Sequence, residues 1–235
     1  MLNYRFIAAI VGLVLAFTPV VIAAPADAPP AKSAEQARID QAIEAYAGKL
    51  KADDEKALDQ AVANRATALL RDPNSLVLGN PDGDVAIVEF FDYTCPYCKA
   101  VDPRLQELLR TDKGVKLIIK EFPILRPESL VAAKVAFASA RQGRYESFHR
   151  AVLAFRGLLT EPAIFEIAAS VGLDVERLRK DMDAPEIADA IIANFNLARA
   201  LRVTTTPTFI IGTHFVTESS ATLDFAKAVA AARAK

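Results

Sequence analysis

The chain has 235 residues, of which 52% are apolar, and its 28 basic and 29 acidic residues give a net charge of −1. This length suits one domain with an appendage or two small domains, and the apolar share is large enough for a buried core. The balanced charge excludes the basic surplus typical of proteins that bind nucleic acid, and a supply of two cysteines and two histidines excludes a histidine-rich metal site.

The first 24 residues have the pattern of an export signal. Arg5 is their only charged residue, residues 6–23 are almost entirely apolar, and small residues stand at 23–26. This pattern predicts a signal peptide that is removed by cleavage, although an apolar run of this length can also just span a bilayer as an uncleaved anchor. We therefore expect a periplasmic location, in a compartment where disulfides are formed and handled.

Two segments of different character follow the signal. Residues 25–32 are dominated by proline and alanine and are expected to form a flexible tether. Residues 33–72 hold mostly helix-favouring residues, with Ser33 and Gln36 in the positions of a capping box. The pattern predicts a helical arm that ends before Pro73.

A narrow apolar seam runs along the predicted arm. Its side chains stand at spacings of four and three, the pattern of a helix that pairs with another helix. A break at residues 51–55 shifts the register of the seam. Two interpretations remain open: the arm joins copies of the chain into a homo-oligomer, or it folds back on its own domain. The seam consists of Ile39, Ile43, Tyr46, Leu50, Leu58, Val62 and Leu69.

Residues 73–235 are expected to form one domain that opens with a strand, a helix and a strand. Residues 85–91 are nearly all apolar, as in a central strand that is buried on both faces. A helical pattern begins at the cysteine pair and ends near residue 114, and residues 115–122 form a second strand. This order predicts a parallel crossover unit and an α/β fold.

A long helical region separates these strands from the last one. Glycines and a proline divide it into five helices between about residues 126 and 201. A strand is then expected from Thr206 to Ile211, followed by a turn and by a final helix over residues 222–232.

The sequence Cys95-Pro96-Tyr97-Cys98 carries the chemistry of the chain. A haem attachment site needs a histidine after the second cysteine, where Lys99 stands, and a structural zinc site usually needs four nitrogen or sulfur ligands. A redox-active dithiol that needs no cofactor remains. At the start of a helix, free N–H groups and the helix dipole lower the pKa of Cys95, so that it attacks as a thiolate and Cys98 resolves the mixed disulfide. A merely stabilising disulfide is the alternative, but it would close so small a loop that its entropic contribution is low.

Two segments of this domain resemble one family. Residues 88–98 (VEFFDYTCPYC) and 205–212 (TTPTFIIG), with the helical region between them, resemble the DsbA-like branch of the thioredoxin superfamily over about residues 75–235. The resemblance implies a thioredoxin-like fold with a large helical insertion, here preceded by the helical arm. It also implies that the protein is a thiol–disulfide oxidoreductase.

The resemblance assigns roles to three further residues. Pro207 matches the family's cis-proline, which packs against the cysteine pair, and the backbone of Thr206 would bind a substrate strand. Without the resemblance, Pro207 is only a proline that opens a strand. Glu89 matches a buried acid that relays protons to the resolving cysteine, a role that needs a raised pKa. The alternative is a carboxylate at the edge of the sheet, or one that pairs with Lys120.

For four other residues the sequence predicts a position in the fold and no chemical role. Asp92 and Tyr93 are expected to shape the surface beside the cysteines. His149 is expected to be a packing or surface histidine, and His214 to stand in a turn that can lie near the substrate face.

The arm and Thr206 also resemble features of the oligomeric ScsC-type proteins and of disulfide isomerases. The resemblance implies a homo-oligomer formed through residues 33–72 and isomerase activity, since several copies around a cavity hold misfolded chains by avidity. We expect exported cysteine-containing proteins as substrates and a membrane redox partner. One alternative is a monomeric oxidase of DsbA type, and another is an envelope protein that binds copper through two thiolates.

Overall fold

The computed structural model describes residues 34–234. The predicted signal peptide, the tether and Ser33 lie outside the described residues. Within helix α1, Ala34–Ala63, the chain divides into one compact unit that ends at Tyr46 and another that begins at Ala47. Among the described helices, none combines the length and the apolar character that a membrane crossing requires.

The second unit is built on a mixed sheet. Its strands are β1 (Leu76–Gly79), β2 (Val85–Phe91), β3 (Val115–Glu121), β4 (Thr208–Ile211) and β5 (His214–Phe215). Their order is β1-β3-β2-β4-β5, with β2 and β3 parallel and the other neighbouring pairs antiparallel. β2 is therefore a central strand, and every one of its residues is buried.

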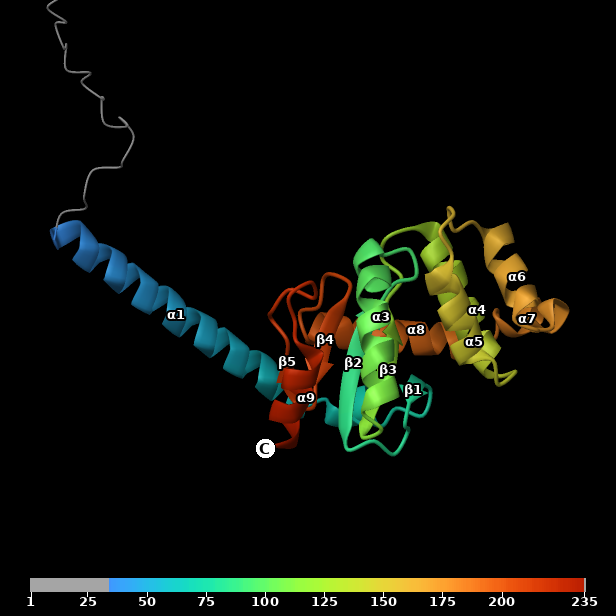
Figure 1. Ribbon diagram of the computed structural model, residues 1–235. Coiled ribbons are helices and arrows are strands. Elements are labelled where there is room, and N and C mark those ends of the chain that lie inside the picture. Colours follow the sequence, from blue (N-terminus) through green and yellow to red (C-terminus); the bar gives the residue numbers. More distant parts are fainter. Residues whose placement is uncertain (1–33, 235) are drawn as a thin grey trace, which may run out of the picture. The chain divides into compact units, whose positions relative to one another are not determined.

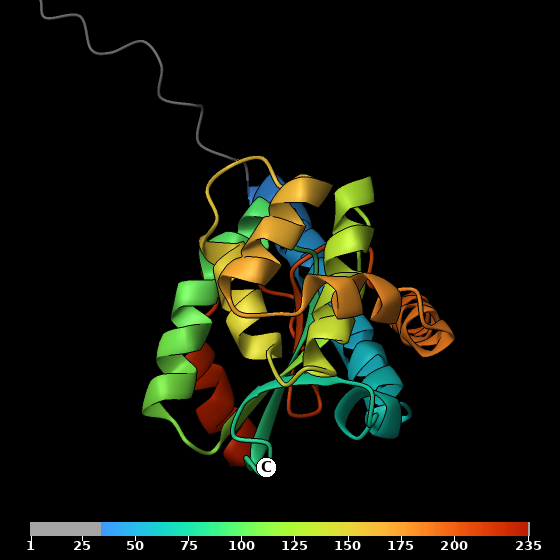
Figure 2. The same ribbon diagram turned by 90° about the vertical axis from the view of Figure 1, so that its right-hand side faces the viewer.

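Helices cover both faces of this sheet (Figures 1 and 2). Among the helices that contact its strands are α2 (Ala66–Leu70), α3 (Pro96–Thr111), α8 (Pro185–Ala200) and α9 (Phe225–Arg233). The helices α4 (Pro127–Ala140), α5 (Tyr145–Ala154), α6 (Glu161–Ser170) and α7 (Val175–Asp181) pack on one another. On one face, Ile87, Phe91 and Ile119 share a core with α3, α9 and the helices that follow β3. On the other face, Val88 and Ile118 pack with residues of α1, α2 and the end of α8.

The predicted fold class is confirmed. α3 connects the parallel strands β2 and β3, and α4 to α8 form the helical insertion between β3 and β4. Strand β1 is missing from the sequence prediction, because four residues with alternating burial give too short a pattern to stand out. The final helix begins at Phe225, three residues later than predicted, where the Asp224 carboxylate caps it by accepting a hydrogen bond from the N–H of Lys227.

The predicted arm is broken into two helices, and its second half packs on its own domain. A turn at residues 64–65 separates α1 from α2. Val62 and Leu69 are buried and Leu58 is half-buried against the sheet, so this half follows the fold-back interpretation. The first half keeps large apolar side chains that are 46–66% exposed in the single chain. These are Ile39, Ile43, Tyr46 and Leu50.

A buried ion pair fastens the segment after α2 to the sheet. Lys120, in β3, is 1% exposed. Its amino group donates hydrogen bonds to the Asp72 carboxylate at 3.0 Å, to the Ala68 carbonyl at 2.8 Å and to the Ser75 hydroxyl at 2.8 Å. Because a buried ammonium is costly without partners, these three acceptors fix where the segment lies.

We expect Asp72→Asn to lower the free energy of unfolding by about 2 kcal/mol at pH 7, because Lys120 loses its counter-charge. Burial tends to raise the pKa of Asp72, but hydrogen bonds from Asn74 and Lys120 hold it below its usual value. A carboxyl group with such a depressed pKa stabilises the fold above about pH 4 and loses this contribution as the pH falls. Urea unfolding at pH 7 and pH 3 should therefore show a difference that shrinks in acid, and an unchanged difference would contradict the ion pair.

Candidate functional site: a dithiol at the start of helix α3

The two cysteines lie where a buried strand gives way to a helix. β2 ends at Phe91, and α3 begins at Pro96 with Cys95 as its N-cap residue. The backbone N–H of Cys98 donates a hydrogen bond to the Cys95 sulfur at 3.4 Å, and Pro96 stands in the first turn, where a missing N–H costs nothing. Both cysteines are free thiols and are 2% and 1% exposed.

Asp92 organises the loop between the strand and the cysteines. One carboxylate oxygen accepts hydrogen bonds from the N–H of Thr94 and the hydroxyl of Ser129, both at 2.7 Å. The other accepts from the N–H groups of Ile124 at 2.9 Å and Leu125 at 3.0 Å. Asp92 is 1% exposed, so the expectation that it shapes the surface is wrong. It holds the loop that carries Cys95 against the loop that follows β3.

Thr206, which precedes Pro207, meets Cys95 from a distant part of the chain. The peptide bond between Thr206 and Pro207 is cis. The Cys95 sulfur lies 3.2 Å from the Thr206 carbonyl oxygen, to which it donates a hydrogen bond in its protonated form. The antiparallel pairing of β4 with β2 brings these residues, 111 positions apart for Cys95 and Thr206, to one place.

The surroundings separate the two thiols chemically. A hydrogen bond with the Cys98 thiol is the main cause that lowers the pKa of Cys95 to about 6. Burial opposes this effect, and the N–H groups of Cys98 and Tyr97 assist it. Burial is the main cause that raises the pKa of Cys98, and Cys95 and the charge of Glu89 raise it further. At neutral pH Cys95 is therefore a thiolate and Cys98 a thiol, as an attacking and a resolving cysteine require.

Glu89 lies behind the cysteines on the central strand. It is 2% exposed, and one of its carboxylate oxygens has no hydrogen-bond partner in the described part of the chain. Burial raises the pKa of Glu89 well above its usual value, and the charges of Asp102, Cys95 and Glu121 add to this effect. Because β2 is central and Lys120 pairs with another acid, both alternative interpretations of Glu89 are wrong.

Sequence reasoning missed two further buried acids near Glu89. Asp102, on α3, stands four residues after Cys98, and burial raises its pKa. Glu121 ends β3 in register with Phe91, so its side chain leaves the sheet on the same face as that of Glu89. Its pKa is raised well above the usual value, chiefly by burial. The helical spacing from Cys98 and the parallel register are the signals that could have revealed these acids.

Both histidines contact polar side chains of distant segments. His149 is 2% exposed, and its Nδ1 atom lies 3.0 Å from the Tyr93 hydroxyl and 3.3 Å from the Tyr145 hydroxyl. Burial lowers the pKa of His149 to about 3, so the ring is neutral. Tyr93 is fully buried in the same cluster, and its expected role at the surface is wrong. His214 lies on the edge strand β5 and pairs with Asp59 of α1 at 2.9 Å.

Three segments of the domain carry exposed apolar side chains: the turn of the cysteine pair, the loop after β3 and the loop after α5. Tyr97, between the two cysteines, is 67% exposed. Leu125 is 48% exposed in the loop that Asp92 anchors. Leu158 is 67% exposed in the loop after α5. The three side chains come from separate segments, so no continuous stretch of sequence predicts an apolar surface here.

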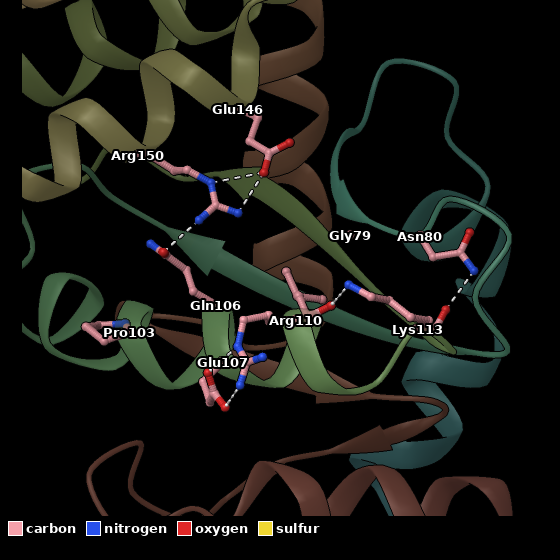
Figure 3. A pocket seen from close by; sticks show the side chains of 10 residues that line it. Gly79, Asn80, Pro103, Gln106, Glu107, Arg110, Lys113, Glu146 and Arg150 are labelled. Carbon is pink, nitrogen blue, oxygen red and sulfur yellow. Dashed lines mark hydrogen bonds and ion pairs between the residues drawn. The ribbon is translucent and has the colours of Figure 1, made fainter.

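A cavity of about 560 Å³ lies beside α3, and neither cysteine lines it (Figure 3). Arg150 crosses its wall, donating to the Glu146 carboxylate at 2.6 Å and to the Gln106 side chain at 2.7 Å. Arg110 pairs with Glu107 at 2.6 Å. Both arginines are thus paired with acids of the same wall, and the amino group of Lys113, which also lines the cavity, donates to the Leu109 carbonyl at 3.2 Å.

The chain is similar to known proteins over the domain that holds the dithiol. Residues 86–230 match the family model of the DSBA-like thioredoxin domain. The crystal structure of a thioredoxin-like oxidoreductase from Silicibacter pomeroyi DSS-3 is 41% identical, with a TM-score of 0.68 over 72% of this chain and 98% of that one. The catalytic domain of Proteus mirabilis ScsC is 25% identical, with a TM-score of 0.67 over 75% of this chain and 99% of that one.

Some curated relatives are much longer than the region they share with this chain. Na(+)/H(+) antiporter NhaA 3 of Salinispora tropica is 30% identical over 137 residues, which make up 57% of this chain and 21% of the antiporter. The chain thus spans about a fifth of the length of such relatives, and the likeness concerns that part alone.

Proposed function

This chain belongs to the DSBA-like thioredoxin domain family, and we propose that it catalyses thiol–disulfide exchange with exported proteins. One observation carries the proposal: Cys95, with its pKa lowered to about 6, caps helix α3 in front of the buried thiol of Cys98. A thiolate at a helix start beside a second thiol has the chemistry of an attacking and resolving pair.

The exchange takes two steps. The Cys95 thiolate attacks one sulfur of a substrate disulfide, a bond forms between them, and the other substrate sulfur leaves as a thiolate that takes up a proton. Cys98 then gives its proton to the Glu89 carboxylate and attacks the Cys95 sulfur, releasing the second substrate thiolate. The substrate gains two electrons, and Cys95 and Cys98 become the disulfide.

The same intermediate also permits isomerisation. If a thiol of the substrate, rather than Cys98, displaces Cys95, the substrate keeps a disulfide in a new place and Cys95 leaves unchanged. Run backwards from the Cys95–Cys98 disulfide, the two steps oxidise a substrate. The proposal favours isomerase or reductase activity over oxidation alone, on the basis of the arm and of Thr206.

The first half of the arm supports a homo-oligomer. Its four exposed seam residues stand at the spacing of a helix that pairs with another helix, and water would otherwise cover them. Several copies would place several dithiols around one misfolded chain and raise its residence by avidity. The exposed Tyr97, Leu125 and Leu158 would supply contacts for the apolar segments that a misfolded chain exposes.

The proposed location is the periplasm, reached by means of the predicted signal peptide. Each substrate that is reduced or oxidised leaves Cys95 and Cys98 in the opposite redox state. A membrane redox partner would have to restore the starting state. Cysteine-containing exported proteins are the proposed substrates, because the periplasm is where their disulfides form.

Reactivation of scrambled ribonuclease tests the isomerase proposal. Cutting the chain at Pro73 would remove Val62 and Leu69 from the core, so the sharper variant keeps the helix and replaces the seam residues Ile39, Ile43, Tyr46 and Leu50 by serine. We expect the native chain to sediment as an oligomer and to reactivate the ribonuclease. The seam variant should sediment as a monomer and lose most of this activity, while its oxidation of small dithiols survives.

A matched control replaces exposed polar residues of the same helix, Gln41, Glu44 and Lys49, by serine. This control should keep both the oligomer and the isomerase activity. If neither the native chain nor the control reactivates ribonuclease, while both oxidise a reduced substrate quickly, the protein is a dithiol oxidase and the isomerase proposal is wrong.

A further inference from the structure

Lys99 links the dithiol helix to the loop after α5. It follows Cys98 directly, and its backbone N–H donates to the Cys95 carbonyl at 3.2 Å. Its amino group donates to the carbonyl of Phe155, the C-cap residue of α5, at 3.4 Å. Residues four apart lie on one face of a helix, so Lys99 shares the face of Cys95.

A second cation stands beside this contact. Arg156 follows Phe155 and is exposed. Burial lowers the pKa of Lys99, and the positive charge of Arg156 lowers it further. Among the described residues, no carboxylate lies within ion-pair distance of Lys99 or Arg156. Six other arginines are so paired: Arg110, Arg141, Arg150, Arg177, Arg179 and Arg233.

Two neighbouring cations without a counter-ion repel each other, and this repulsion is relieved when an anion binds between them. The site is open to a substrate chain, because Arg156 is exposed and the nearby Tyr97 and Leu158 are each 67% exposed. A segment that reaches Cys95 with its cysteine therefore passes both apolar and positively charged groups.

Resting on the proposed exchange function, we propose that Lys99 and Arg156 form a subsite for an acidic side chain of the substrate. The subsite selects protein segments that carry Asp or Glu beside the cysteine that Cys95 attacks. The ligand is thus a side-chain carboxylate of a protein substrate, held next to apolar contacts with Tyr97 and Leu158.

Three model peptides test the subsite. Each carries one cysteine as a mixed disulfide with 2-thiopyridine, flanked by two Glu, two Gln or two Lys residues. The Cys95 thiolate bonds to the peptide sulfur, the disulfide breaks, and pyridine-2-thione leaves with a proton, so its absorbance reports the rate. At low salt the reduced native chain should react about fivefold faster with the Glu peptide than with the Lys peptide, the effect of two exposed ion pairs. In 0.5 M salt this preference should largely disappear.

The double variant Lys99→Gln/Arg156→Gln should lose the preference and keep its rate with the Gln peptide within about twofold, because a glutamine at 99 can still donate to Phe155. Arg144→Gln, which removes an exposed arginine at the other end of α5, should keep the preference. Equal rates with all three peptides in the native chain, or a preference that survives in the double variant, would overturn the subsite. Absence of reaction with every peptide, the uncharged one included, is a different result: it would overturn the exchange function and the subsite together.

Discussion

The variant Cys98→Ala is expected to become a trap for substrates. Cys95 still attacks, but no second thiol of the protein is left to release the bound chain, so mixed disulfides accumulate. The test is to express the tagged variant in a bacterial periplasm, quench with acid and an alkylating reagent, and identify captured proteins on non-reducing gels and by mass spectrometry.

Cys95→Ala is the matched control for the trap. Its remaining thiol, Cys98, is buried and has a raised pKa, so it should capture almost nothing, and exchange activity should fall by at least about a thousandfold, as for removal of other catalytic nucleophiles. Equal and negligible capture by both variants would contradict exchange and would favour the binding of a soft metal such as copper by the two thiolates.

Glu89→Gln is expected to slow the release step about a hundredfold, the usual scale for loss of a general base. The same change should stabilise the fold at pH 7. A carboxyl group whose pKa is raised by folding costs no stability below its unfolded pKa and destabilises the fold as the pH rises above it. In the native chain the release rate should rise with pH as Glu89 ionises, and the variant should lose this rise.

The release step is followed with a fluorescent peptide bound to Cys95, and stability is followed by urea unfolding. Glu121→Gln is the matched control, because Glu121 is buried on the same face of the sheet and is not among the groups that act on the Cys98 thiol. It should also raise stability. Because the charge of Glu121 raises the pKa of Glu89, this variant should move the rise in release rate to lower pH but keep the plateau rate within about threefold. Equal slowing by both variants would contradict a relay through Glu89.

Much of the domain could be read from local sequence patterns. Residues 85–91 are nearly all apolar because β2 is buried on both faces. The breaks between α4, α5, α6 and α7 contain Gly143, Gly157 and Gly172, and Pro185 opens α8, as predicted. The position of Cys95 at a helix start followed from Pro96 and from the apolar strand before it. These features depend on residues that are close in the sequence, where periodicity and turn residues carry the signal.

The remainder depends on contacts between distant segments. The fold-back of Leu58, Val62 and Leu69 cannot be told from pairing with another copy, because both need the same apolar spacing. The burial of Asp92 could not be predicted either, because a charged residue in a loop usually faces water. Its partners Ser129, Ile124 and Leu125 stand more than 30 residues away. Only the structure shows that Asp92 is buried and holds the loop that carries Cys95.

The fold makes Cys95 a thiolate at neutral pH, ready to attack a disulfide. The most direct measurement is the rate at which iodoacetamide, a neutral reagent, alkylates Cys95 in the reduced protein between pH 4 and pH 10, with the modified cysteine identified by mass spectrometry. We expect the rate to reach half of its plateau near pH 6, as the lowered pKa of Cys95 requires. A midpoint at about pH 8.5, that of an ordinary cysteine, would contradict it.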